Sequence, residues 1–171
     1  MLRLYHRYSK DIDLFVPDPQ YLGHVSPRLT DAAEALTTEY QEAAEFTKLL
    51  LPEGEIDFVV GTPLTDVPWE LSEYLDRTIR VETCAEIIAK KMHFRGQFAK
   101  ARDLFDLCAV AELDPGAIEA ARPFMKKNAK AFLERLKAYE DLTRNDFEKI
   151  DSLDFQPTFE ECLILAEKIL G

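Results

Sequence analysis

The stretch "TCAEIIAKKMHFRGQFAKARDLFDLCAVAEL", residues 83–113, indicates two consecutive helices and decides the fold of the second half of the chain. At about 100° per residue, the first helix carries one broad apolar arc, made of Cys84, Ala85, Ile87, Ile88, Met92 and Phe94. Glu86 and Lys90 fall on the opposite side, where they are expected to form an exposed i,i+4 ion pair.

Charged residues interrupt the apolar faces of both helices. Lys91 projects into the middle of the apolar arc, so its ammonium either extends out of the core or reaches into a cleft to meet negative charge. In the second helix, Asp103 and Asp106 lie one turn apart on the apolar face. Arg102 can pair with Asp106 at i,i+4, whereas Lys91 can supply a partner for Asp103. A Lys91–Asp103 pair fits either a structural link between two helices or a functional site.

The first half of the chain carries strand patterns. Apolar and β-branched runs bounded by proline and glycine lie at about 11–16, 45–51 and 55–60 and in "RTIRVET", 77–83. "PEGE", between the second and third runs, is typical of a hairpin turn. A helix is expected to start after Ser26 as N-cap, with Pro27 at its first position. Trp69 is expected to pack in the core.

Together these patterns predict an α+β fold, with a small mixed β-sheet core over residues 1–82 and a C-terminal helical domain over 83–171. Breaks in the helical half are expected near Gly96 and around 114–116 and 152–158. The last helix, "FEECLILAEKIL", carries an apolar stripe that suits docking on the body of the protein.

Three aspartates in the strand patterns form the clearest candidate site. Asp11 and Asp13 alternate onto one face of the first strand, with Cα atoms about 6.5–7 Å apart, while Ile12 and Leu14 are expected to anchor its other face. If the strand "EIDFVV" pairs beside it, Asp57 becomes a third carboxylate on the same face. Oxygen ligands at this spacing suit Mg²⁺ or Mn²⁺, and three such acids on adjacent strands can hold one or two divalent ions for phosphoryl or nucleotidyl transfer. Strand-end acids that are merely solvated are the alternative.

Composition limits the classes of function. With 21 basic against 32 acidic residues and a formal charge of −11, the chain is unlike a general nucleic-acid coat protein. A basic helix face, with Arg122, Lys126 and Lys130 at i,i+4 steps, fits an RNA backbone, although a solvated surface is the favoured interpretation. The absence of a signal peptide or long apolar stretch favours a cytoplasmic protein without a membrane span. The three cysteines have no metal-ligand spacing and are expected to be small buried residues: Cys84, Cys108 and Cys162.

The ordered set "HRYSKDIDLFV", "EIDFVV" and "AEIIAKKMHFRGQFAKARDLFDLCAV" resembles the AbiEii/AbiGii toxin family, within the DNA polymerase β-like nucleotidyltransferase superfamily. The resemblance covers most of the chain. It implies a nucleotidyltransferase core followed by a helical domain, transfer of a nucleotide from an NTP, and an RNA acceptor, in some members the tRNA 3′ end. It also implies a cognate antitoxin encoded nearby.

The resemblance assigns a role to each candidate residue. Asp11 and Asp13 match the family's metal-binding acids, and Asp57 matches the third acid of the superfamily. Lys91 and Asp103 match the lysine and the acid of the helical motifs, so that Lys91, with Arg102 and Asp106, is expected to contact the nucleotide.

One feature of the family pattern is not seen ahead of Asp11. The family has a Gly-Gly/Ser–Ser/Thr turn there whose N–H groups hold the triphosphate, whereas residues 1–10 contain no glycine. A catalytically silent nucleotidyltransferase-fold module for binding or interaction is therefore the alternative function.

Overall fold

The computed structural model describes residues 3–171 and confirms the expected α+β fold. The chain forms two compact units, one of Ser9–Pro63 and the other of the residues up to Tyr8 together with Leu64–Gly171. The domain boundary at 82/83 expected from the sequence stays a prediction. No helix among residues 3–171 combines the length and the apolar character that crossing a membrane requires.

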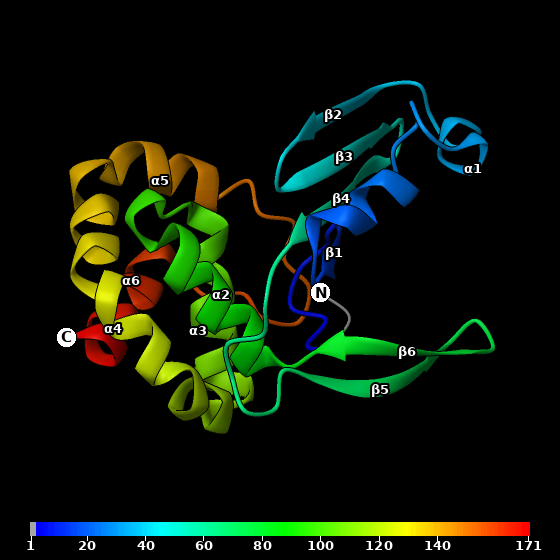
Figure 1. The fold of residues 1–171 in the computed structure, drawn as a ribbon. Coiled ribbons are helices and arrows are strands. Elements are labelled where there is room, and N and C mark those ends of the chain that lie inside the picture. The colour runs from blue at the N-terminus through cyan, green and yellow to red at the C-terminus, as the bar shows by residue number, and fades with distance from the viewer. Residues whose placement is uncertain (1–2) are drawn as a thin grey trace. The chain divides into compact units, whose positions relative to one another are not determined.

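The Ser9–Pro63 unit is built on a four-stranded mixed sheet (Figure 1). Its strands are β1 (Ile12–Val16), β2 (Tyr40–Ala43), β3 (Phe46–Leu51) and β4 (Gly54–Val60), in the order β1-β4-β3-β2. β1 pairs parallel with β4, and the other two pairings are antiparallel. The expected hairpin of β3 and β4 is confirmed, and Gly54 at its turn lies so close to the backbone that an added Cβ would be 2.2 Å from the carbonyl oxygen of Lys10.

The helix expected after Ser26 is wrong in its start and length. A six-residue 3-10 helix, η1 (Pro19–His24), precedes Ser26, and the only α-helix of the unit is the single turn α1 (Asp31–Glu34). After α1 ends, the Thr37 hydroxyl donates a 2.8 Å hydrogen bond to the carbonyl of Leu50. This bond ties the segment to β3 and directs it into β2.

The apolar side chains of β1 are not anchored as expected. Ile12 and Leu14 are 55% and 42% exposed. β1 is an edge strand with one neighbour, so its side chains have cover on one side alone.

The other unit contains a two-stranded ribbon and a group of helices (Figure 1). Its elements are β5 (Trp69–Tyr74), β6 (Arg77–Glu82), α2 (Cys84–Arg95), the 3-10 helix η2 (Gly96–Phe98), α3 (Ala101–Leu113), α4 (Pro115–Ala138), α5 (Glu140–Phe147) and α6 (Phe159–Leu170). The breaks expected near Gly96, 114–116 and 152–158 are confirmed, whereas the break at Tyr139 was not expected. Trp69 is not a core residue, because it lies on exposed β5 with the Arg80 guanidinium 4.9 Å from its ring centroid.

Helix α3 is the centre of the helical core. It contacts α2, α4, α5 and α6, and its central side chains are at most 2% exposed: Leu104, Phe105, Leu107, Cys108 and Val110. The docking stripe on α6 is confirmed by its buried residues, Phe159, Cys162 and Ala166. The cysteines are buried and free, and burial raises the pKa of Cys84 to about 11, so its thiol stays protonated at neutral pH.

The N-terminal segment is part of this helical unit. The backbone N–H of Tyr8 donates to Asp151 O (2.9 Å), and that of Leu153 donates to His6 O (3.0 Å). Arg3 donates to the carbonyls of Val81 and Glu82 on β6, at 2.8 and 2.6 Å. Residues 3–8 are therefore held along the segment that precedes α6 and along the ribbon.

The expected i,i+4 pair of Glu86 and Lys90 is present at 3.5 Å, but its expected exposure is wrong, because the two residues are buried, with 0% and 7% exposure. The Glu86 carboxylate accepts hydrogen bonds from the N–H groups of Leu64 and Thr65, at 2.9 and 2.8 Å, and from the Thr65 hydroxyl at 2.7 Å. Burial acts to raise the pKa of Glu86, but these donors and Lys90 outweigh it and the pKa is lowered. Glu86 therefore fixes the chain where it enters the helical unit at Leu64.

Replacing Glu86 by alanine is expected to lower the free energy of unfolding by about 2–4 kcal/mol, because the Leu64 and Thr65 donors and the Lys90 charge lose a buried partner. Glu161→Ala is the matched control, since Glu161 is also the third residue after a threonine N-cap but is exposed. The loss expected for Glu161→Ala is clearly smaller, because its capping hydrogen bonds are exposed to solvent. Urea denaturation of both variants checks the difference, and equal losses would contradict it.

Candidate active site

A row of charged side chains crosses three strands of the sheet. In the parallel pairing of β1 with β4, Asp13 lies opposite Asp57, and in the antiparallel pairing of β4 with β3, Asp57 lies opposite Lys48. Residues opposite one another in a sheet place their side chains on the same face. The pairing of the "EIDFVV" strand beside the first strand is therefore present, and it brings Asp13, Asp57 and Lys48 together.

Asp11 is placed differently from the other two acids. It lies just before β1, and its Oδ1 accepts a 3.3 Å hydrogen bond from the backbone N–H of Glu55. Across residues 3–171, no three His, Cys, Asp or Glu side chains lie close enough to enclose a metal ion. The close cluster of three carboxylates expected from the sequence is therefore not formed, because Asp11 is turned to the β4 backbone.

Asp57 has one oxygen in an ion pair and one without a partner. Its Oδ2 is 3.3 Å from Lys48 Nζ, and its buried Oδ1 has no hydrogen-bond partner among the described residues. Burial raises the pKa of Asp57, Lys48 opposes this, and the charges of Asp13 and Glu55 add to the rise. A buried carboxylate oxygen without a donor, beside a second carboxylate, fits the ligand set of Mg²⁺ or Mn²⁺.

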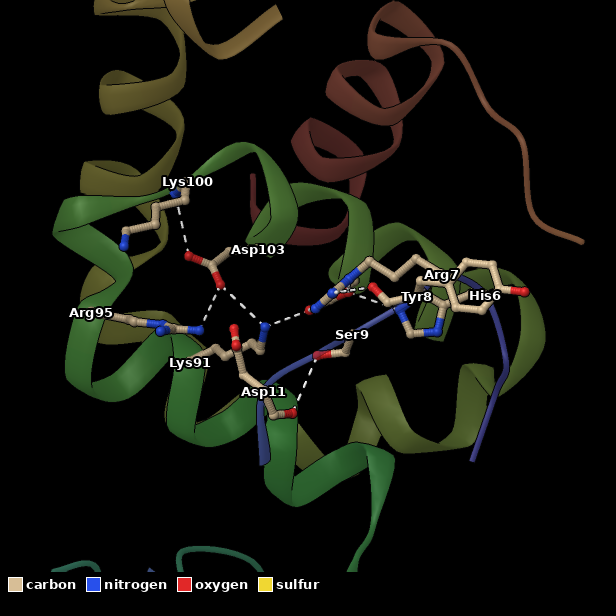
Figure 2. Close-up of polar contacts among 10 residues, drawn as sticks. His6, Arg7, Tyr8, Ser9, Asp11, Lys91, Arg95, Lys100 and Asp103 are labelled. Atoms are coloured by element: carbon tan, nitrogen blue, oxygen red, sulfur yellow. Dashed lines mark hydrogen bonds and ion pairs between the residues drawn. The ribbon is translucent and has the colours of Figure 1, made fainter. Parts of the chain in front are cut away.

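A second charge centre lies in the helical unit around Asp106, a fully buried residue of α3. Asp106 Oδ1 accepts a 2.8 Å hydrogen bond from His6 Nε2. Arg7 donates to both carboxylate oxygens, at 2.6 and 2.9 Å, and the Lys91 ammonium forms an ion pair with Oδ2 (Figure 2). Burial acts to raise the pKa of Asp106, but Lys91, His6 and Arg7 outweigh it and hold the pKa well below its usual range. The carboxylate thus stays ionised inside the core.

Asp103 joins two further basic residues to this centre. Its Oδ1 lies 3.2 Å from Lys91 Nζ and accepts a 2.9 Å hydrogen bond from Arg95 Nη2 (Figure 2). Its Oδ2 accepts from the backbone N–H of Lys100 at 3.3 Å, which fixes the carboxylate at the start of α3. The expected proximity of Lys91 and Asp103 is present, and Lys91 also bridges to Asp106.

Arg102, expected to bind nucleotide and to reach Asp106, is exposed on α3. The N-terminal segment and α2 supply partners of Asp106, namely His6, Arg7 and Lys91. A role of Arg102 toward a nucleotide stays a prediction.

The sequence did not reveal three members of this centre: His6, Arg7 and Arg95. Arg95 follows Lys91 by four residues on the same helix, and this spacing was a usable signal. His6 and Arg7 lie 100 and 99 residues from Asp106, so no local pattern connects them.

The helical centre holds more positive than negative groups. Lys91, Arg7 and Arg95 surround two carboxylates, and Arg95 and Lys91 keep 40% and 14% of their side chains exposed. Buried carboxylates that fix a guanidinium and an ammonium in place prepare them for a further anion, and phosphate oxygens are their common partners.

The charge of Asp106 is expected to stabilise the helical unit strongly. Asp106→Asn should lower the free energy of unfolding at pH 7 by about 3–5 kcal/mol, because Lys91 and Arg7 would keep buried positive charge without their anion. Asp141→Asn, an exposed acid on α5, is the control and should change little.

The pH dependence of this loss follows from the lowered pKa. Because the folded pKa lies below the unfolded value of about 4, the contribution of Asp106 is complete above pH 4 and is lost as the pH falls through the folded pKa. Urea titrations of the wild type and Asp106→Asn between pH 3 and pH 7 check this. Equal free energies of unfolding for the wild type and Asp106→Asn at pH 7 would contradict the prediction.

The raised pKa of Asp57 predicts the opposite effect. Its ionised form is disfavoured in the folded protein, so Asp57→Asn should raise the melting temperature at pH 7 by a few degrees. The gain should shrink as the pH falls through the folded pKa toward the unfolded value of about 4, because the wild-type carboxyl is then neutral in both states. Glu53→Gln, exposed in the β3–β4 turn, is the control for scanning calorimetry. A lower melting temperature for Asp57→Asn would refute the interpretation.

Comparison with known proteins identifies the family to which the chain belongs. A family model described as nucleotidyl transferase AbiEii toxin, Type IV TA system, matches residues 1–168. No curated protein and no solved structure shows a match to the chain. Since the family match covers nearly the whole chain, this protein belongs to the AbiEii family of nucleotidyl transferase toxins of type IV toxin–antitoxin systems.

Proposed function

We propose that this protein is a Mg²⁺-dependent nucleotidyltransferase that transfers a nucleotide from an NTP to an RNA acceptor such as tRNA. The observation that carries the proposal is the row of Asp13 and Asp57 on adjacent parallel strands, with the unpartnered Oδ1 of Asp57. Membership of a nucleotidyl transferase family supports the proposal, because nucleotidyl transfer commonly uses metal ions held by carboxylates.

The acids of the sheet would hold the divalent cation, Mg²⁺ or Mn²⁺. Asp13 and Asp57 are the ligands that the register places side by side, and Asp11 joins them once its oxygen leaves the Glu55 N–H. When bound, a divalent cation neutralises charge on the transferred phosphoryl group and lowers the pKa of the acceptor hydroxyl. Asp57 would hold a cation and thereby help to activate that hydroxyl.

The basic helical centre would bind the negative charge of the triphosphate. Asp103 holds Lys91 and Arg95 on one oxygen, so both cations are oriented before the nucleotide arrives. Arg95 is the more exposed of the two, and its planar guanidinium is matched to phosphate oxygens. Arg102 on the exposed face of α3 would add a third positive charge.

An antitoxin is the partner that the family implies. We propose that a cognate antitoxin, encoded nearby, counteracts the transferase in the cell. The basic face of α4 is not assigned to the RNA, because Arg122 is paired with Glu119 at 2.7 Å and Lys130 lies 3.6 Å from Glu134.

The alternative function is a catalytically silent module with the same fold. It is favoured by one observation, the absence of a metal-enclosing trio of acids among residues 3–171. Calorimetry with Mg²⁺ and each NTP separates the two functions, since no detectable binding at millimolar nucleotide would favour the silent module.

Asp13→Ala is expected to reduce the transfer of labelled nucleotide from NTP to RNA by at least about 100-fold, because the metal site loses a carboxylate worth several kcal/mol to the transition state. Asp31→Ala, an exposed acid of α1 in the same unit, is the matched control and should retain wild-type activity. Wild-type transfer by Asp13→Ala would refute the assignment.

A further inference from the structure

The acid row contains a lysine that nothing in the proposed chemistry requires. Lys48 Nζ lies 2.5 Å from Glu55 Oε2 and 3.3 Å from Asp57 Oδ2, and its side chain is 24% exposed. Glu55 precedes Asp57 by two residues on β4, so both carboxylates project from the same face of the sheet. One ammonium is therefore shared by two acids, one of which is the candidate metal ligand.

The position of Lys48 conflicts with a cation on Asp57. Lys48 and Asp57 are opposite one another in the β3–β4 register, so the lysine cannot leave this face of the sheet without rearranging the strand. A divalent cation bound to Asp57 would then lie within a few ångströms of the ammonium, and two like charges at that distance repel one another even in water.

Glu55 provides the place to which Lys48 can withdraw. Its carboxylate is already the nearer partner, at 2.5 Å against 3.3 Å for Asp57. A small movement of the ammonium toward Glu55 would free Oδ2 of Asp57, next to the Oδ1 that has no partner.

We propose that Lys48 is a built-in counter-ion that occupies Asp57 in the metal-free protein, withdraws to Glu55 when a divalent cation binds, and thereby sets the affinity for that cation. The proposal rests on the proposed metal site at Asp13 and Asp57. Lys48 is a positioning residue, because it acts on the metal through Asp57. Lys48 weakens the affinity of the site for a divalent cation. The site is therefore filled at high concentrations of the cation and empty at low concentrations.

The test is the binding of Mn²⁺ alone, without nucleotide, measured from the electron paramagnetic resonance signal of free Mn²⁺. Lys48→Met is expected to bind Mn²⁺ about tenfold more tightly than the wild type, because one unit of positive charge beside the divalent ion is removed. Lys48→Arg keeps the charge and should bind with an affinity close to that of the wild type. If Lys48→Met does not fold, Lys48→Gln removes the same charge and is measured in its place.

Two control variants separate this effect from a change in overall charge. Arg28→Met removes a positive charge from the same unit, at a residue 3.5 Å from Glu42. Glu42 lies opposite Thr47, next to Lys48 along β3, so it projects from the other face of the sheet. The Mn²⁺ affinity of Arg28→Met should therefore equal that of the wild type. Asp13→Ala should lose the site.

Each outcome decides the proposal. If the wild type binds Mn²⁺ and Lys48→Met binds it equally or more weakly, the counter-ion role is refuted while the metal site stands. An equal gain in Arg28→Met would also refute it, because the effect would then come from net charge. If no variant binds Mn²⁺, the metal site and the role of Lys48 both fall.

Discussion

The buried carboxylate of Asp106 is the interaction on which the helical unit depends. A charge at 0% exposure is costly unless it is paired, and Asp106 receives His6 and Arg7 from the N-terminal segment and Lys91 from α2. These pairs fasten two parts of the chain, the N-terminal segment and α2, to α3. They also fix Lys91 and, through Asp103, Arg95, so the same charges that stabilise the core orient the groups proposed to meet phosphate. Stability and binding are therefore linked at this point.

The two charge centres have opposite electrostatic balances. In the sheet, burial and the charge of Asp13 raise the pKa of Asp57, and the opposing charge of Lys48 does not offset them. In the helical unit, Asp106 has an excess of cations, and its pKa is lowered despite its burial. A site with surplus negative charge favours a metal ion, and a site with surplus positive charge favours an anion. Each unit therefore carries a charge centre of its own, with opposite demands on a ligand.

Local patterns in the sequence predicted much of this fold. The alternation around Asp13 and Asp57 located β1 and β4, and the apolar faces located α2, α3 and α6. The pairing of β1 with β4 was only assumed, and the structure shows it. Features fixed by distant contacts escaped prediction. Glu86 resembled a surface residue because its partners, Leu64 and Thr65, come from a loop. Arg7 was missed because it meets Asp106 across 99 residues, and Trp69 was misplaced because an exposed ribbon and a buried strand share one composition.

The anchoring of residues 3–8 beside the segment before α6 has a kinetic consequence. The hydrogen bond from Leu153 N–H to His6 O and the pairing of Arg7 with Asp106 join positions that are far apart along the chain. Contacts of such high sequence separation are slow to form, because the intervening chain must first be ordered. During synthesis the N-terminal segment leaves the ribosome first but completes its contacts last. Until then Asp106 lacks two of its hydrogen-bond partners, His6 and Arg7, so the helical unit reaches full stability after most of its helices exist.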